Sequence, residues 1–285
     1  MKYAIVVPTC NSNDKCEGLL TNLLDSIVWG GYVDKGSPVV ICWEPDCASI
    51  IQKFEQKYPF ITSLKPGMSI IGPNGPVNLN FTKNANRGLR YVHKELPDCD
   101  GLICLNQDTV VPAAAHLEKI FNDGISNATG EHFDGSAWNK VQNLNNKNSP
   151  GCPCNKTIYQ GKLEDSKKFA CFCTWISRRA LDTIGYFDDK TFVGSWEDDD
   201  YVVRALLAGL PCQVSPIRVH HELKGRDPNK GESISTTGSY SLNDLGISGY
   251  KFIQKWNLPF GLERHAEFAD YILANWKGSP ELKCE

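Results

Sequence analysis

The chain has 285 residues, of which 41% are hydrophobic and 10% are aromatic, so it is large enough and apolar enough to bury a full core. This composition excludes a disordered chain. The formal net charge is -3, from 30 basic and 33 acidic residues, which excludes the strongly basic surface typical of proteins that bind nucleic acid or anionic membranes. We therefore expect no nucleic-acid partner.

The N-terminal residues predict a strand rather than an export signal. Residues 3–7 form a strand-length apolar run that follows Met1 and Lys2 and ends at Pro8. This run is too short for the apolar region of a signal peptide. No apolar stretch of the chain approaches the ~20 residues that a transmembrane helix needs. We therefore expect a cytoplasmic protein with no transmembrane segment.

The chain contains 12 cysteines, which suit either a disulfide framework or buried thiols in a reducing compartment. Cys42 and Cys104 lie inside apolar runs, so reduced thiols are the favoured interpretation. An alternative is a structural zinc site made by the C-x-C pairs at residues 152–154 and 171–173. This spacing is less typical of zinc than C-x₂-C, and the second pair lies in an apolar run where it is expected to pack.

Strands and helices alternate in the first part of the chain. Apolar runs predict buried strands at residues 3–7 and 39–43, and helical periodicity predicts helices at 19–29 and 50–58. This alternation is typical of a parallel α/β sheet. Ligands of such sheets bind beyond the carboxyl ends of the strands, which here are residues 8–11 and 44–46.

The next segment predicts a further strand with an acid at its end. Residues 77–92 are expected to be a loop that enters a helix, and residues 101–105 a hydrophobic strand. Asn106, Gln107 and Asp108 follow this strand directly, so Asp108 is poised to meet a ligand or a metal ion. A helix is predicted at 113–121. Residues 122–168 are rich in Asn, Gly, Lys and Ser and are expected to form a long surface excursion.

The second half of the chain continues with the same elements. A strand is predicted at residues 169–176, a short helix at 179–184, and a strand at 213–219 that ends at His220 and His221. Residues 225–238 are expected to be a mobile loop. Helices at 248–256 and 263–276 are expected to close the fold.

Four consecutive acids, at residues 197–200, open a predicted helix. Ser195 is a candidate N-cap, and negative charge in the first turn is favoured by the helix dipole. Asp200 precedes Arg204 by four residues, a spacing that allows an ion pair on one face of the helix. Gly209 and Pro211 predict the end of the helix. The acids either cap this helix or take part in chemistry, and the local sequence is compatible with both.

Three features together suggest a metal and phosphate site. Asp108 follows one strand, the acids at 197–200 open a helix, and His220 and His221 end a later strand. Carboxylates with an imidazole suit Mn²⁺ or Mg²⁺ bound beside a phosphate. Taken one at a time, acids usually cap or pair, and a lone histidine is more often structural.

The order of four sequence blocks resembles the GT-A fold glycosyltransferases of family 2, in particular the rhamnosyltransferase-like branch. The blocks are IVVPTCN at residues 5–11, NLNFTKNANRG at 78–88, LNQDTVVP at 105–112, and GYFD…WEDDD…R…G at 185–209. A weaker echo, KFIQKW, lies at 251–256. The resemblance covers most of the chain except residues 122–168.

The resemblance implies a single α/β domain of the GT-A type, with a Rossmann-like, mostly parallel sheet flanked by helices. Residues 1–112 would form the nucleotide-sugar-binding half and residues 113–285 the acceptor-binding and catalytic half. The implied activity is inverting, metal-dependent transfer of a sugar from a nucleoside diphosphate donor to a glycan hydroxyl. The donor would be of the UDP or dTDP type, carrying rhamnose or another hexose.

The resemblance also implies residue roles. Asp108 would bind Mn²⁺ or Mg²⁺, with Asn106 in place of the first acid of the family's DxD motif. His220, or failing it His221, would supply a later metal contact, and Asp198 would be the general base. Neighbouring acids would raise the pKa of Asp198, and the helix N-terminus would lower it. The implied donor-binding residues are Pro8, Thr9, Asn11, Glu44, Asp46, Lys83, Asn86, Arg87, Asn106, Gln107 and Asp108, and the implied acceptor-binding residues are Trp196, Glu197 and Asp199.

Two other functions compete with this interpretation. A sugar-nucleotide nucleotidyltransferase would need a glycine-rich, basic phosphate loop after the first strand, and Pro-Thr-Cys-Asn does not supply one. A non-catalytic glycan-binding protein with the same fold would not need to keep Asp108 and Asp198. Trp138, Trp175 and Trp196 are candidates for a sugar-stacking platform, although core packing is an equally good interpretation. A helix entry rich in capping residues is likewise the alternative for Lys83.

Overall fold

A computed structural model describes residues 1–9, 14–44, 47–65, 71–72, 75–76, 81–149, 170–192, 196–222, 242–259 and 265–285. The strands are β1 (Tyr3–Pro8), β2 (Val39–Cys42), β3 (Ile61–Leu64), β4 (Ile71–Gly72), β5 (Gly75–Pro76), β6 (Gly101–Leu105), β7 (Thr109–Val110), β8 (Ile125–Glu131), β9 (Cys173–Ser177) and β10 (Cys212–His221). The helices are α1 (Asp14–Trp29), α2 (Ala48–Lys57), α3 (Phe81–Glu95), α4 (Ala114–Leu117), η2 (Glu118–Ile120), α5 (Ala137–Lys147), α6 (Arg178–Ile184), α7 (Glu197–Leu207), α8 (Leu242–Lys255) and α9 (His265–Asn275).

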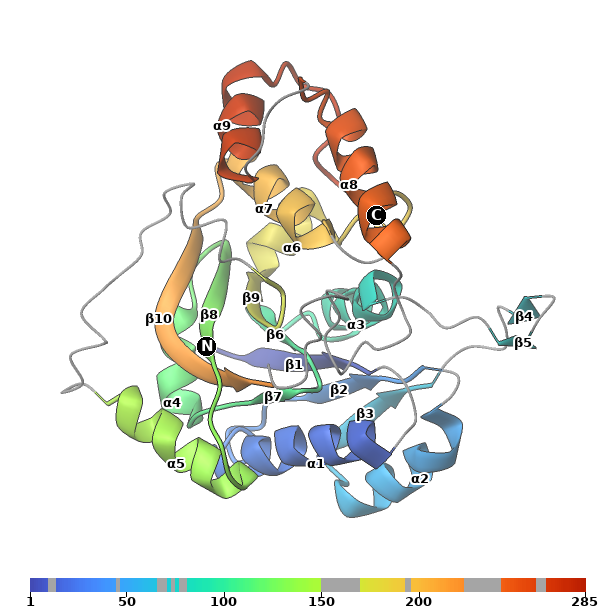
Figure 1. Ribbon diagram of the computed structural model, residues 1–285. Coiled ribbons are helices and arrows are strands. Elements are labelled where there is room, and N and C mark those ends of the chain that lie inside the picture. Colours follow the sequence, from blue (N-terminus) through green and yellow to red (C-terminus); the bar gives the residue numbers. More distant parts are fainter. Residues whose placement is uncertain are drawn as a thin grey trace.

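The core of the molecule is one eight-stranded sheet in the order β3-β2-β1-β6-β9-β8-β10-β7 (Figure 1). Strands β3, β2, β1 and β6 are parallel, and β8 is parallel to β10. Strand β9 is antiparallel to both β6 and β8, and β7 is antiparallel to β10. The expected α/β fold with a mostly parallel sheet is therefore confirmed.

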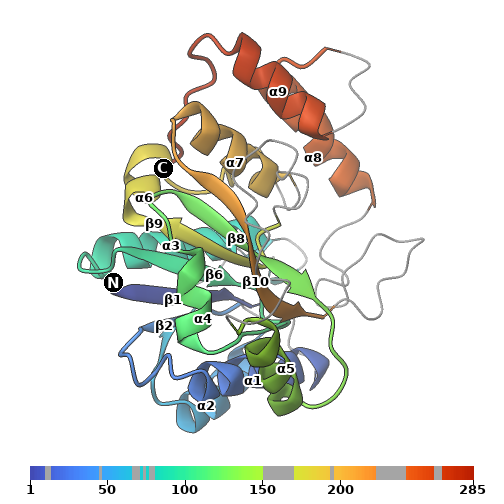
Figure 2. The ribbon, with the colours of Figure 1, turned by 90° about the vertical axis from the view of Figure 1, so that its left-hand side faces the viewer.

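Both faces of the sheet are covered by helices, so its central strands are apolar throughout. Ile5 and Val7 of β1 pack with α1 and α2 on one face, whereas Ala4 and Val6 pack with α3, α6 and α7 on the other. Figures 1 and 2 show α1 and α2 below the sheet and α3 above it. Successive side chains of a strand point to opposite faces of the sheet, so the apolar run of β1 contributes to two hydrophobic clusters, one on each face.

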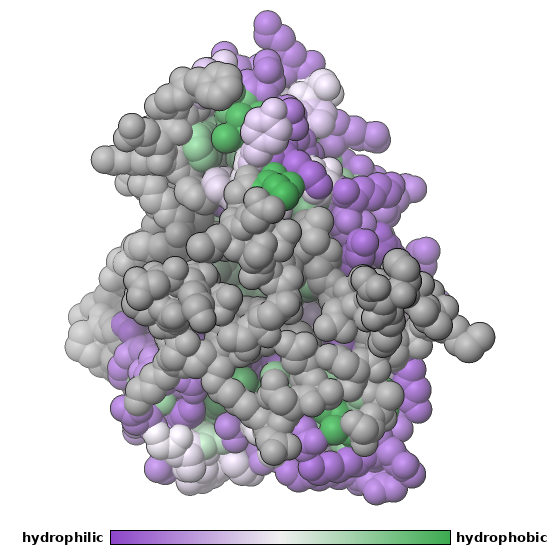
Figure 3. All heavy atoms as spheres, turned by 45° about the vertical axis from the view of Figure 1, so that its right-hand side comes forward, coloured by the Kyte–Doolittle hydropathy of each residue, from purple (hydrophilic) through white to green (hydrophobic). Residues whose placement is uncertain are grey.

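Helices α8 and α9 form a further layer over α7, at the top of the molecule in Figure 1. Val203 of α7 packs there with Phe252 and Trp256 of α8 and with Phe268 and Ile272 of α9. This layer therefore covers the helix that carries the four acids. On the face shown in Figure 3, the described surface is mostly hydrophilic, and hydrophobic side chains form small, separate patches.

The prediction of a surface excursion at residues 122–168 is wrong for β8. Strand β8 lies inside the sheet between β9 and β10, and Ile125 and Asn127 are fully buried. Two polar side chains of β8 find partners in neighbouring strands: Thr174 donates to Asn127 Oδ1 (2.8 Å) and Thr129 donates to the Ser215 carbonyl (2.7 Å). These hydrogen bonds offset the cost of burying Asn127 and Thr129 in the sheet. Helix α5 then follows, capped by Ser136.

The described cysteines and helices match two further expectations. All nine described cysteines are free thiols. No helix in the described part of the chain is both long and apolar enough to cross a membrane. Several predictions lie outside the described residues, namely the loop at 225–238, the N-cap Ser195, the donor contacts Asn11 and Asp46, and the thiols of Cys152 and Cys154.

Candidate active site

Helix α3 clamps the carboxyl ends of the first three parallel strands. The Asn84 amide donates to the Thr9 carbonyl (2.9 Å) and to the Cys42 carbonyl (2.8 Å). The Arg87 guanidinium donates to the carbonyls of Trp43 (2.9 Å) and Leu64 (2.9 Å). Arg87, predicted as a donor contact, therefore holds the strand ends in place, and Asn84 is a structural residue that the sequence analysis missed.

Asn86, another predicted donor contact, joins α3 to the segment that leads to the acids. Its side chain accepts from Phe187 N–H (3.0 Å) and donates to the Phe187 carbonyl (2.8 Å) and to Asp189 Oδ2 (2.9 Å). Asn86 is fully buried, whereas Lys83 of the same helix is exposed. Asn86 thus joins α3 to the segment that precedes α7, and its side chain does not face open solvent.

The remaining predicted donor contacts end β1 and β2. Pro8 and Thr9 are buried, and the Thr9 hydroxyl donates to the Cys42 carbonyl (3.0 Å). Glu44, the second residue after β2, is 1% exposed. A buried acid and a buried hydroxyl at adjacent strand ends are the polar groups that the expected ligand position requires.

Asp108 lies in a tight turn between β6 and β7. Asn106 N–H donates to the Phe172 carbonyl (2.9 Å), and Glu222 N–H donates to the Asp108 carbonyl (3.0 Å). Gln107 and Asp108 are each 3% exposed. The turn is thereby held by β9 on one side and by the end of β10 on the other.

The histidine beside Asp108 is His221. Its Nε2 lies 3.4 Å from Asp108 Oδ1, and its ring stacks on Phe172 with 4.6 Å between the ring centroids. Two neighbouring ligands of an octahedral ion with bonds of about 2.1 Å lie about 3 Å apart. The Asp108–His221 spacing therefore fits two adjacent positions around Mn²⁺ or Mg²⁺, with an oxygen and an imidazole nitrogen as donors.

His220 has a different environment. Its Nδ1 accepts from Phe133 N–H (3.0 Å), and its Nε2 lies 3.0 Å from Lys140 Nζ. Burial, followed by the positive charge of Lys140, lowers the pKa of His220 to about 4, so the ring is neutral at physiological pH. Nδ1 already accepts a hydrogen bond, and the Lys140 ammonium occupies the position in front of Nε2, so a metal ion has no free approach to either ring nitrogen.

His220 also belongs to a second group of metal-ligand type. The ligand atoms of His132, His220 and Glu222 lie within 4.8 Å of one another. Lys140 Nζ lies 3.5 Å from Glu222 Oε2, so an ammonium already compensates the carboxylate. A metal ion at this position would have to displace Lys140. Of the two groups, Asp108 with His221 is the better match to the expected metal site.

The acidic helix α7 begins after an unusual backbone turn. Trp196 adopts a left-handed conformation with φ 71°, which is rare for a bulky residue. Its indole packs 5.2 Å from the Phe252 ring, and a Cβ on Gly249 would meet it at 3.1 Å. Trp196, predicted as an acceptor contact, therefore packs its ring against α8.

Asp198 is half-buried and electrostatically destabilised as an anion. Burial, followed by the charges of Asp199 and Glu197, raises the pKa of Asp198 well above its ordinary value, although Asp199 N–H donates to Asp198 Oδ1 (3.0 Å). Glu197 is 6% exposed and Asp199 is half-buried. A partly accessible carboxylate with a raised pKa has the properties of a general base.

The dipeptide Cys171–Phe172 connects Asp198 to the Asp108 turn. Cys171 packs in the same apolar cluster as Tyr201 and Val202 of α7, and burial, followed by the negative charge of Asp198, raises the pKa of its thiol. The next carbonyl, that of Phe172, accepts from Asn106 N–H and from the Thr109 hydroxyl (3.2 Å). Asp198 and Asp108 therefore stand on the same end of β6 and β9.

Asp200 differs from the acids before it. It is fully buried and forms an ion pair with Arg204 (2.8 Å), as the spacing of four residues predicts. Its other oxygen accepts from Trp256 Nε1 (3.0 Å) and lies 2.7 Å from Lys255 Nζ. Asp200 consequently anchors α8 to α7. Asp198 and the half-buried Asp199 remain as candidates for a chemical role.

Arg204 and the C-terminal residues hold the segment before α7. The Arg204 guanidinium donates to the carbonyls of Ile184 (2.7 Å), Tyr186 (2.8 Å) and Leu282 (3.1 Å). Gly185 has φ 70°, and a Cβ there would lie 1.9 Å from the Cys284 carbonyl oxygen. Only glycine fits this close approach.

Comparisons with known proteins support the fold. No protein-family model matches the chain, and no curated protein matches its sequence. The structure of S. aureus TarS 1-349 is similar with a TM-score of 0.53 and 15% identity, covering 96% of this chain and 70% of that one. Another S. aureus TarS structure is similar with a TM-score of 0.54 and 17% identity, and this chain spans 42% of its length.

A third structure is the mannosyltransferase PcManGT from Pyrobaculum calidifontis in complex with GDP-Man and Mn²⁺, with a TM-score of 0.47 and 11% identity, covering 96% of this chain and 79% of that one. Its TM-score is too low to carry an argument. At 15–17% identity, the likeness to TarS concerns the fold alone. Together with the mixed, mostly parallel sheet and its flanking helices, it identifies the architecture as the GT-A fold.

Proposed function

We propose that this protein is a glycosyltransferase that moves a sugar from a nucleoside diphosphate donor to a hydroxyl of a glycan acceptor, with inversion. The observation that carries the proposal is that the Asp108–His221 pair and the helix that carries Asp198 both lie next to Cys171–Phe172, where β9 approaches the end of β6. This arrangement combines a candidate base with a candidate metal site at the carboxyl end of the sheet. The GT-A fold supports the same activity.

Asp108 and His221 are the residues that would hold Mn²⁺ or Mg²⁺. When bound there, the ion would neutralise negative charge that develops on the diphosphate leaving group. Asn106, which replaces the first acid of the DxD motif, has a buried side-chain oxygen without a hydrogen-bond partner among the described residues. An orphaned acceptor two residues before Asp108 supports a ligand that donates to it.

Asp198 would take the proton of the acceptor hydroxyl. As the acceptor oxygen bonds to the anomeric carbon, the bond from that carbon to the diphosphate oxygen breaks with its electron pair. The acceptor proton moves to the Asp198 carboxylate. Burial and the nearby acids raise the pKa of Asp198, so the carboxylate holds this proton more tightly than an exposed aspartate would.

The donor would lie over the ends of β1 and β2, in the half formed by residues 1–112. Thr9 and Glu44 border this position, and Asn84 and Arg87 fix the strand ends beneath it. Glu197 and Asp199 would contact the acceptor from the half formed by residues 113–285. A UDP or dTDP donor that carries rhamnose or another hexose is the proposed class.

A panel of UDP-, dTDP- and GDP-sugars tests the proposal. With Mn²⁺ and a mixture of oligosaccharide acceptors, we expect the wild type to release a nucleoside diphosphate from at least one donor. Addition of a chelator should stop the release, and Asp199→Asn serves as the matched control for Asp198→Asn. If no donor is bound or turned over with either Mn²⁺ or Mg²⁺, the protein is not a glycosyltransferase.

A further inference from the structure

A cavity of about 300 Å³ lies between the end of α8 and the end of α9. Three aromatic residues line it, namely Trp256, Tyr271 and Trp276. Its polar groups are mainly the amides of Asn257 and Asn275 and the hydroxyl of Ser279, and among the described residues that line it Lys277 is the only charged one. The cavity has the size of a small-ligand pocket.

This lining matches the chemistry of a neutral sugar. Aromatic faces pack well against apolar surfaces, and the C–H faces of a pyranose are such surfaces. Amides both donate and accept hydrogen bonds, as sugar hydroxyls do. A phosphate or a carboxylated ligand would contact one cation and two side-chain amides of this lining. These groups form only a weak anion-binding site.

The two tryptophans of the cavity differ in their hydrogen bonding. Trp256 donates its N–H to Asp200 Oδ1 (3.0 Å), whereas Trp276 Nε1 is buried and has no acceptor among the described residues. A buried donor without a partner carries a desolvation cost. A ligand hydroxyl that reaches it after a small rotation of the indole would remove this cost.

The cavity is connected to the candidate base through one side chain. Trp256 lines the cavity and bonds to Asp200, which lies two residues after Asp198 on α7. Helix α9 packs with α8 against α7 in one hydrophobic cluster. A sugar in the cavity would therefore contact the layer of helices that packs on α7.

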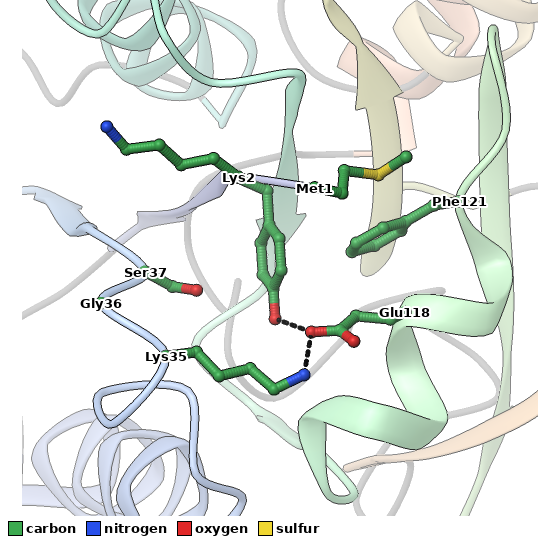
Figure 4. A pocket seen from close by; sticks show the side chains of 8 residues that line it. Met1, Lys2, Lys35, Gly36, Ser37, Glu118 and Phe121 are labelled. Carbon is green, nitrogen blue, oxygen red and sulfur yellow. Dashed lines mark hydrogen bonds and ion pairs between the residues drawn. The ribbon is translucent and has the colours of Figure 1, made fainter.

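Two other cavities lack this character. One, of about 450 Å³, is lined by Lys35 and Glu118, and Glu118 already accepts from both Lys35 and the Tyr3 hydroxyl (Figure 4). The other, of about 290 Å³, contains His93, which lies 2.8 Å from Asp182. Glu118 and His93 therefore already have partners within the protein.

We propose that the cavity formed by Trp256, Tyr271 and Trp276 is a subsite that binds a neutral sugar unit of the glycan acceptor. The identification of this sugar as part of the acceptor rests on the proposed glycosyltransferase function. The binding of a neutral saccharide rests on the cavity alone. The two claims are therefore separable by experiment.

Indole ¹H–¹⁵N signals of the full chain test the subsite directly. Trp276→Phe assigns the Trp276 signal, and Trp43, which is fully buried and donates its N–H to Ser63 Oγ, is the internal control. The probes are the methyl glycosides of glucose, galactose, mannose, rhamnose, xylose and N-acetylglucosamine and the corresponding disaccharides, added without donor. We expect saturable movement of the Trp276 signal with at least one probe, no movement of the Trp43 signal, and loss of the response in Asn275→Ala.

The outcomes distinguish this inference from the proposed function. The same Trp276 response in Asp198→Asn, which removes the proposed base, supports a subsite that is independent of turnover. Saccharide binding in a protein that turns over no donor leaves the subsite intact and removes the glycosyltransferase proposal. If no probe moves the Trp276 signal, or if UDP moves it as strongly as the saccharides do, the subsite assignment is overturned.

Discussion

Nε2 of His221 lies 3.4 Å from Oδ1 of Asp108, whereas the adjacent His220 turns its ring to Phe133 and Lys140. Neighbouring residues of a strand point to opposite faces, so only one of the two histidines is able to reach the Asp108 turn. His221 is therefore the candidate metal ligand, whereas His220 is held by contacts with other residues.

This division predicts different effects of two matched substitutions on metal binding. His221→Gln should weaken Mn²⁺ affinity in the presence of UDP by at least about tenfold, because a ligand is lost. His220→Gln should leave the affinity within about threefold, since its amide oxygen still accepts from Phe133 N–H. Electron paramagnetic resonance of free Mn²⁺ measures both. A larger loss in His220→Gln than in His221→Gln would place the metal in the His132–Glu222 group instead.

Replacement of the proposed base should remove turnover without removing donor binding. We expect Asp198→Asn to lower kcat by about 10²- to 10⁴-fold, the usual contribution of a general base. The donor affinity should stay the same, because Asp198 contacts the acceptor hydroxyl. Steady-state release of nucleoside diphosphate and calorimetric donor binding check the two parts. Equal losses in Asp198→Asn and Asp199→Asn would show that the cluster acts through its charge and not through one base.

The raised pKa of Asp198 also predicts how stability depends on pH. The folded protein binds the Asp198 proton more tightly than the unfolded chain does, so the free energy of unfolding decreases as the pH rises from about 4 through the folded pKa. Asp198→Asn mimics the neutral acid and should therefore raise the Tm at pH 8. Near pH 3, where aspartates are protonated in both states, the difference should vanish. A variant that is less stable than wild type at pH 8 would contradict the raised pKa.

The buried Arg204 predicts a large loss of stability. Arg204→Ala leaves the Asp200 carboxylate with one partner fewer and leaves three carbonyl oxygens without this donor, so we expect a loss of about 3–5 kcal/mol in the free energy of unfolding. Arg179 forms an exposed pair with Asp123, and Arg179→Ala should cost no more than about 1 kcal/mol. Urea unfolding curves compare the two. Similar losses would mean that the Arg204 network contributes little.

Much of the fold follows from local sequence because its central strands are buried on both faces. Apolar runs and helical periodicity therefore locate β1, β2, β6 and the helices between them. Strand β8 was not predicted, because a buried polar strand has no local signature in the sequence. The hydrogen-bond partner of its Asn127 is Thr174, which lies 47 residues away. The half-buried edge strand β3 was missed for a similar reason, since its apolar pattern is weak.

The sequence predicted which types of residue form the candidate site, but it predicted less of how these residues are arranged. The acids and histidines stand out in the sequence, but which histidine meets Asp108 depends on how β10 pairs with β7. The role of Arg87 depends on carbonyls from two other strands that only the folded sheet brings together. Trp196 packs inward because α8, some 50 residues later, provides its partner Phe252.

The anomeric configuration of the product tests the account most directly. A time course of ¹H NMR spectra, with a donor that the protein turns over and an oligosaccharide acceptor, reports both transfer and stereochemistry. Direct displacement assisted by Asp198 predicts that the first product formed carries the sugar in the configuration opposite to that of the donor. A first product with the donor's configuration, or release of free sugar without any transfer, would contradict a single inverting displacement at this site.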